Sequence, residues 1–142
     1  MDELAEAAGR RLAELTGAEW GVITAGTAAT LALATAACIA GNNPELMLRL
    51  PETSVLPNKE LIPSDQRFSY EQAIRIAGGE IVSVATVERL AEALDGSAAM
   101  ICLLGRMDSA SVLPLSAAVP LARFPHVQPM KGSARREACP KI

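Results

Sequence analysis

The chain has 142 residues and a mass of 14.9 kDa, which suits one ordinary domain and excludes two complete ones, because typical domains have about 100–150 residues. Its 13 basic and 16 acidic side chains give a net charge of −3, so no overall positive field attracts nucleic acid, and no nucleic-acid partner is expected. A hydrophobic fraction of 50% with only 3% aromatic residues excludes a disordered chain and predicts a core of Ala, Leu, Ile and Val.

The first third of the chain predicts a helix, a strand and a second helix. Apolar residues recur at three- and four-residue steps over residues 2–16, and Gly17 can end that helix. A short β-branched run at residues 20–24 predicts a strand. The Ala- and Leu-rich segment 27–40, followed by Gly41, predicts a buried helix.

Prolines interrupt residues 42–63, where we expect a winding connection with a short strand near residues 60–62. A helix beginning at Phe68 or Ser69 and running through Ala77 follows, and then a strand at residues 81–84.

Further along the chain, residues 87–94 predict a helix and residues 98–104 predict a strand that is buried on both faces. One more helix is expected at residues 114–122. Strands that alternate with helices indicate an α/β fold with a mainly parallel sheet. Residues 123–142 have no apolar period, and we expect them to form a divergent, disordered basic tail.

Cysteine spacing and the N-terminal sequence favour a cytoplasmic location. Cys38, Cys102 and Cys139 are far apart, so neither a disulfide scaffold nor a metal site is expected. We expect Cys38 and Cys102 to be buried thiols that act as small hydrophobic residues. The acidic start at residues 1–6 differs from a signal peptide. The uncharged stretch 20–41 is long enough to cross a membrane, but it is rich in Ala and Thr, so we expect no membrane association.

The feature that bears most directly on chemistry is the turn Ala25-Gly26-Thr27 between the predicted strand and helix. The first turn of a helix presents unpaired N–H groups, and small residues allow an anion to approach them. The turn lacks both the Lys of a P-loop and the glycine spacing of a dinucleotide site. A phosphate site and simple close packing both remain open for these small residues.

Several short sequence motifs, in their order along the chain, resemble the selenocysteine-synthase-like group of pyridoxal-phosphate (PLP) enzymes. This group includes L-seryl-tRNA(Sec) selenium transferases and D-glucosaminate-6-phosphate ammonia-lyases. The resemblance covers residues 2–122 and is nearer to the ammonia-lyase-like members. The motifs are Glu3-Leu4-Ala5-Glu6-Ala7-Ala8-Gly9-Arg10, Leu15-Thr16-Gly17-Ala18-Glu19-Trp20, Thr24-Ala25-Gly26-Thr27-Ala28-Ala29, Leu50-Pro51-Glu52-Thr53-Ser54, Arg67-Phe68-Ser69-Tyr70 and Ala77-Gly78-Gly79-Glu80-Ile81-Val82.

The resemblance implies a three-layer αβα fold, with residues 1–122 forming part of the aminotransferase-like, PLP-binding large domain of fold type I. It implies that Ala25, Gly26 and Thr27 hold the cofactor phosphate, and that Arg67 faces a phosphate or carboxylate. The family commonly has a His-Arg pair over the cofactor, and here Gln66 replaces the histidine.

The same resemblance implies an incomplete enzyme. The family has an aspartate that pairs with the pyridine nitrogen and a lysine that forms the Schiff base, and neither is found at a matching position. The lysines are Lys59, Lys131 and Lys141. No catalytic residue is therefore assigned, and we expect a fragment that is inactive alone, because the electron-sink chemistry needs both groups.

Two functions therefore stay open. The first is a fragment of a PLP-dependent lyase or transferase whose intact relatives act on a small molecule, an amino acid or amino-sugar phosphate. The second is a non-catalytic α/β interaction or regulatory module, which at most associates with a homologous full-length chain through residues 2–16 and 27–40, or else a non-functional truncation product. A homo-oligomer is among the expected partners. His126 is expected to be a solvated tail residue, and Asp108 is expected to cap a loop.

Overall fold

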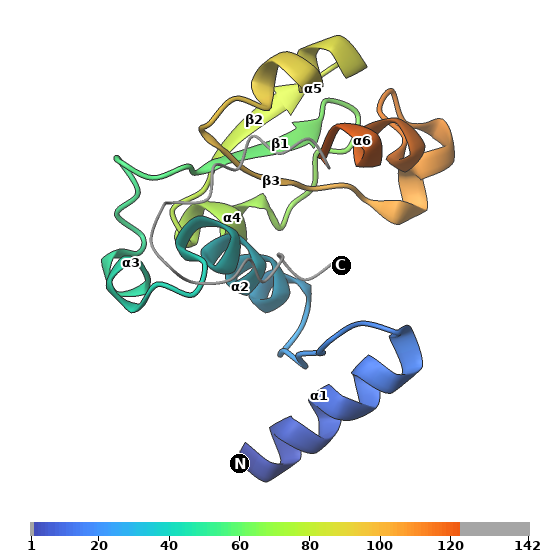
Figure 1. The fold of residues 1–142 in the computed structure, drawn as a ribbon. Helices are drawn as coiled ribbons and strands as arrows, with labels where there is room; N and C mark the ends of the chain where they lie inside the picture. The colour runs from blue at the N-terminus through green and yellow to red at the C-terminus, as the bar shows by residue number, and fades with distance from the viewer. Residues whose placement is uncertain (1, 123–142) are drawn as a thin grey trace.

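A computed structural model describes residues 2–122, and the predicted tail at residues 123–142 lies outside the described residues (Figure 1). Six α-helices, one 3-10 helix and three strands follow one another along this part of the chain. In order they are α1 (Asp2–Thr16), α2 (Thr27–Ala40), α3 (Pro44–Arg49), β1 (Lys59–Pro63), α4 (Glu71–Ile76), β2 (Glu80–Val84), α5 (Val87–Ala93), β3 (Ala98–Ile101), η1 (Gly105–Ala110) and α6 (Leu115–Ala122).

The three strands form one parallel sheet in the order β2-β1-β3. Strand β1 pairs with β2 through Lys59↔Glu80 to Pro63↔Val84. It pairs with β3 through Lys59↔Ala98, and an irregularity after that pair brings Glu60 opposite Met100. The prediction that segments 81–84 and 98–103 share a parallel sheet is confirmed, although β3 ends at Ile101.

Each face of the sheet is covered by two helices, which gives the three-layer αβα arrangement expected from the sequence (Figure 1). On one face, Ile62 packs with Ile74 of α4 and Leu31 of α2. On the other face, Leu61 packs with Leu90 of α5 and Ala118 of α6. Successive residues of a strand point to opposite faces, so β1 supplies the centre of both clusters.

The strand predicted at residues 20–24 is wrong, because these residues are not in a strand in the structure. A strand needs a neighbour for its backbone hydrogen bonds, and the sheet of the described residues contains only β1, β2 and β3. Val22 and Ile23 are about 70% exposed, at 68% and 71%. Residues 20–24 belong instead to the irregular segment that links α1 and α2.

Other differences concern the boundaries of elements. Helix α3 begins at Pro44, within the segment that the prolines predict to be a winding connection, because proline is well tolerated in the first turn of a helix. The Asn43 side chain caps this helix by accepting from the Glu45 and Leu46 N–H groups at 2.9 and 3.3 Å. Helix α4 is shorter than expected, and β1 is longer and central.

Helix α1 extends away from the sheet and its covering helices (Figure 1). Gly17, at a φ of 74°, ends it, as predicted. The helix rests on the link that follows, since a methyl group added at Gly9 would lie 2.5 Å from the Trp20 ring, and one at Gly21 would lie 2.4 Å from Leu12 Cβ. None of the helices described is both long and apolar enough to cross a membrane.

Candidate functional site

The predicted phosphate turn lies at the start of α2, where Gly26 immediately precedes the helix. Its backbone angles, φ 132° and ψ 179°, fall in a region that is essentially restricted to glycine. No side chain caps α2, so its first-turn N–H groups remain available to an anion. Ala25, Gly26 and Thr27 are all exposed.

Two threonine hydroxyl groups brace this turn. Those of Thr24 and Thr30 lie 2.6 Å apart, and both can donate to the Gly26 carbonyl, at 3.1 and 3.2 Å. The Thr30 N–H also donates to that carbonyl, at 3.0 Å. The shape of the turn is therefore fixed by its neighbours, while Thr27 is not needed to maintain it.

Helix α2 runs antiparallel to β1. Near its start Leu31 belongs to the cluster around Ile62, while further along Thr35 and Glu60 both lie beside Gly79. The first turn of α2 is therefore on the side of the sheet where the strands end (Figure 1). Sites in open α/β sheets gather at this edge.

Arg67 lies just after β1, but its guanidinium already has a carboxylate partner. Its Nε and Nη2 donate to the two oxygens of Glu71, one turn further along the chain. Glu71 also accepts from the Phe68 N–H at 3.2 Å, and Arg75 Nη1 lies 3.9 Å from it. The hydrogen bond from Arg67 is the largest of the effects that hold the pKa of Glu71 below its usual value, despite the burial of the carboxylate.

Gln66, which replaces the family's histidine, is buried in the structure. Its Oε1 accepts from the Leu104 N–H at 2.6 Å, and its Nε2 has no hydrogen-bond partner among the described residues. This amide ties the end of β1 to the segment that follows β3, so its visible role is to join two chain segments.

The neighbouring Asp65 and the predicted Asp108 both organise loops. Asp65 accepts from the Val112 N–H at 2.8 Å and from the Ser111 hydroxyl at 3.2 Å. Asp108 accepts from the N–H of Leu115, the first residue of α6, which confirms the predicted capping role.

Lys59 lies at the opposite end of β1 from Gln66 and Arg67. It begins the strand, and its Nζ is 3.4 Å from the Asp95 carboxylate. It is the only lysine among residues 2–122, because Lys131 and Lys141, like His126, lie outside the described residues. The described part of the chain therefore places no lysine beside the predicted phosphate turn.

The cysteine predictions agree in part with the structure. Cys102 is buried, as expected, and burial raises the pKa of its thiol to about 11, so it is an inert core residue. Cys38 is half-buried, and Cys139 lies outside the described residues. Within the described residues no cluster of side chains is suited to hold a metal ion.

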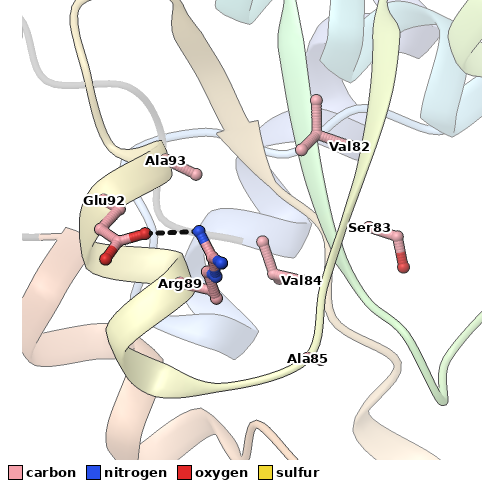
Figure 2. A pocket seen from close by; sticks show the side chains of 7 residues that line it. All are labelled: Val82, Ser83, Val84, Ala85, Arg89, Glu92 and Ala93. Atoms are coloured by element: carbon pink, nitrogen blue, oxygen red, sulfur yellow. Dashed lines mark hydrogen bonds and ion pairs between the residues drawn. The ribbon is translucent and has the colours of Figure 1, made fainter.

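An open groove between β2 and α5 lies on the other face of the sheet from α2. It is lined by Val82, Ser83, Val84, Ala85, Arg89, Glu92 and Ala93. Figure 2 shows Val84 pointing toward α5, and Arg89 bound to Glu92 at 2.9 Å along the helix. None of the predicted site residues lines this groove.

Sequence reasoning missed two acidic residues. Glu71 stands four positions after Arg67 at the start of a helix, and this spacing could have indicated the ion pair. Glu60 is completely buried in the central strand. Its position in the sequence gave no indication of this, because burial on both faces of a short strand depends on helices that come from distant segments.

The chain is similar to a protein of curated function and to proteins of known structure. A curated 5'-C-glycyluridine monooxygenase-decarboxylase from a Streptomyces species is 38% identical over 92 residues, which is 61% of this chain and 23% of that protein. A solved structure of D-glucosaminate-6-phosphate ammonia-lyase superposes with a TM-score of 0.74 and 28% identity, covering 86% of this chain and 36% of the other. No protein-family profile matches the chain.

The structural match confirms the resemblance to the selenocysteine-synthase-like PLP enzymes and their fold. It also fits a partial chain, since the sequence spans about a quarter of the curated relative and about a third of the solved one.

Proposed function

We propose that this chain, which resembles selenocysteine-synthase-like PLP enzymes in sequence and fold, is a segment of a PLP-dependent lyase or transferase. Its turn Ala25-Gly26-Thr27 would hold the cofactor phosphate. When bound in such enzymes, PLP supplies an electron sink for bonds next to an amino group. The intact enzyme would act on an amino acid or amino-sugar phosphate in the cytoplasm.

The observation that carries the proposal is the start of α2. Gly26 adopts a conformation that other residues strongly disfavour, the helix has no side-chain cap, and its first turn lies on the side of the sheet where the strands end. These features suit a phosphate group, which accepts hydrogen bonds and is attracted by the positive end of the helix dipole.

Arg67 has a secondary part in this proposal. Its two hydrogen bonds to Glu71 fix the guanidinium near the end of β1, while 48% of the Arg67 side chain remains exposed. A second anion could therefore share the exposed side of the guanidinium with Glu71, but with less gain than at a free arginine.

Titration of PLP against the wild type and Gly26→Val, followed by absorbance and calorimetry, tests the proposed turn. We expect weak binding by the wild type and about tenfold weaker binding by the variant, because a non-glycine residue at this backbone geometry costs about 1–3 kcal/mol. Inorganic phosphate should compete. Gly96→Ala is the matched control, since a methyl group there meets no atom within 4 Å. Equal affinities for wild type and Gly26→Val would show that the small residues of this turn serve close packing and do not bind phosphate.

Borohydride reduction after PLP incubation tests whether the chain is inactive alone. We expect no stoichiometric adduct on Lys59, because this residue lies at the far end of β1 and pairs with Asp95. Mass spectrometry locates any adduct. A stoichiometric adduct on Lys59, with turnover that Lys59→Ala abolishes, would contradict this part of the proposal.

A second candidate function is a non-catalytic association module. Several large apolar side chains of α1, the following link and α2 are exposed: Leu4 76%, Leu15 66%, Val22 68%, Ile23 71% and Leu33 56%. Exposed apolar side chains on adjoining segments favour association with another protein chain. Sedimentation of the wild type and of Ile23→Ser measures whether the chain self-associates and whether the apolar side chain is needed. If the wild type stays monomeric at all concentrations, the enzyme segment is the better explanation of the chain.

A further inference from the structure

A group of buried polar atoms lies between the sheet and α2, away from the proposed phosphate turn. Glu60 of β1 and Thr35 of α2 are both 0% exposed. Neither carboxylate oxygen of Glu60, nor the Thr35 hydroxyl, has a hydrogen-bond partner among the described residues. Buried polar groups in folded proteins nearly always have partners, so these atoms call for an explanation.

Gly79 brings the two side chains together. A methyl group added at Gly79 would lie 3.0 Å from Glu60 Cγ, 3.1 Å from Thr35 Cγ2 and 2.7 Å from Ile74 Cγ2. Both polar side chains therefore adjoin the turn between α4 and β2, on the sheet face that α2 covers. Ile62 lies on this face as well, two residues after Glu60.

No salt bridge reaches Glu60 from the described residues. From β2 and β3 it meets the apolar register partners Ile81 and Met100. Cys102, just beyond β3, has a thiol whose pKa is raised in part by the carboxylate of Glu60.

The helices covering this face offer Glu60 no cation either. Glu71 of α4 is already bound to Arg67 and Arg75. The titratable residue that α2 contributes is Cys38, which is half-buried. Glu60 therefore faces only apolar, neutral or acidic groups.

We propose that Glu60 is a proton-binding switch that sets how tightly α2 packs on the sheet. With its proton, the carboxyl group is neutral, and burying it costs far less than burying a charge. Without the proton, an unpaired negative charge lies beneath α2, and water must enter or the helix must loosen, because a buried charge without a partner is strongly unfavourable. Burial raises the pKa of Glu60 to about 7, which places the change near neutral pH.

The test follows the intact chain from pH 5.5 to 8.5. Carbon-detected NMR, assigned through bonds in the wild type, reports the titration of the Glu60 carboxyl group directly. Hydrogen exchange, corrected for intrinsic rates, reports the packing of α2. We expect a Glu60 midpoint near neutral pH and at least tenfold faster exchange in the second half of α2 at the upper end of the range, while α5 on the other face changes little.

Two variants locate the cause. Glu60→Gln keeps the shape without the titration and should remove the pH response of α2. Glu80→Gln, at an exposed position on neighbouring β2, should keep it. A Glu60 midpoint near 4.5 in the wild type would overturn the proposal without any variant having to fold. An α2 response that persists in Glu60→Gln would overturn it as well.

Discussion

Glu71 is a buried carboxylate whose charge depends on its arginine partners. Its side chain is 8% exposed, and Arg67 contributes two hydrogen bonds to it while Arg75 stays at 3.9 Å. Removal of one partner of such a pair leaves a charge with too few hydrogen bonds, which costs more than loss of an exposed pair. Arg67 therefore stabilises the end of β1 and the start of α4 whether or not a ligand is present.

Replacing Arg67 with Met should lower the thermal midpoint by about 3 °C or more at pH 7. Arg89→Met is the matched control, because Arg89 and Glu92 form an ion pair of similar spacing that is 74% and 65% exposed, and exposed pairs contribute little. Differential scanning fluorimetry measures both variants, and equal shifts would contradict the structural role of Arg67.

The effect of Arg67→Met should shrink in acid. The pKa of folded Glu71 lies below its ordinary value of 4.5, so its stabilising contribution is present above that pH and is lost as the pH falls through the folded pKa. Thermal midpoints of wild type and Arg67→Met should therefore approach each other as the pH is lowered below 4.5. If the difference between the two thermal midpoints stays constant or widens in acid, the lower stability of Arg67→Met comes from lost packing of the arginine side-chain carbons and not from the ion pair.

The turn from α4 into β2 illustrates how one missing side chain lets two elements meet. Gly79 touches Ile74 from α4 and Glu60 from β1, and no methyl group fits there without displacing one of them. The preceding Gly78 has a φ of 95°, and its carbonyl accepts from the Thr53 hydroxyl at 2.7 Å. The pair of glycines thus fixes where β2 begins.

Gly79→Ala should destabilise the fold by about 1–3 kcal/mol, as is typical when a well-packed site receives an extra carbon. Gly96→Ala should be neutral or slightly stabilising, because that position is open and has no positive φ. Urea denaturation gives both free energies of unfolding. Equal values for the two variants would show that α4 and β1 adjust to the methyl group at no cost.

Helices were more predictable than strands for a physical reason. The end of α1 at Gly17, the end of α2 at Gly41 and the Thr86 cap of α5 depend on residues adjacent in sequence. The link at residues 20–24 looks like a strand locally, but a strand also needs a neighbour, which local sequence does not reveal. The candidate turn at Gly26 was found because it is local, whereas the burial of Glu60 depends on α2 and on the α4–β2 turn.

The described residues form a three-layer αβα sandwich, which is the sheet with its covering helices, and a projecting helix, α1. The hydrophobic clusters on the two faces of the sheet draw their members from residue 31 onward. Helix α1 instead packs on the link through Gly9 and Leu12. Stability of the sandwich should therefore depend little on α1.

Deleting residues 1–18 should change the free energy of unfolding by no more than about 1 kcal/mol, since neither core cluster loses a member. Urea denaturation followed by far-UV circular dichroism measures this, with Leu90→Ala as a positive control. That control should cost about 2–5 kcal/mol, because Leu90 is fully buried. Loss of cooperative unfolding in the shortened chain would show that α1 supports the sandwich.

Overall stability should also respond to the proton on Glu60. Its folded pKa of about 7 lies above the ordinary 4.5, so the contribution of this carboxyl group to stability is fully present below pH 4.5 and is lost as the pH rises through 7. Between pH 5 and pH 8 this carboxyl group alone should remove about 2–3 kcal/mol. The difference between Glu60→Gln and wild type in urea denaturation at the two pH values measures it, and an unchanged difference would contradict a raised pKa.

The order β2-β1-β3 places the first of the three described strands in the middle of the sheet. On the ribosome, β1 emerges before either of its neighbours, and one of its edges stays open until Ala98–Ile101 has left the exit tunnel. An unpaired strand with apolar residues on both faces is prone to aggregation. The order in which the strands are synthesised therefore differs from their order in the sheet, and a nascent chain in which α5 has left the exit tunnel but β3 has not is the species that most needs a chaperone.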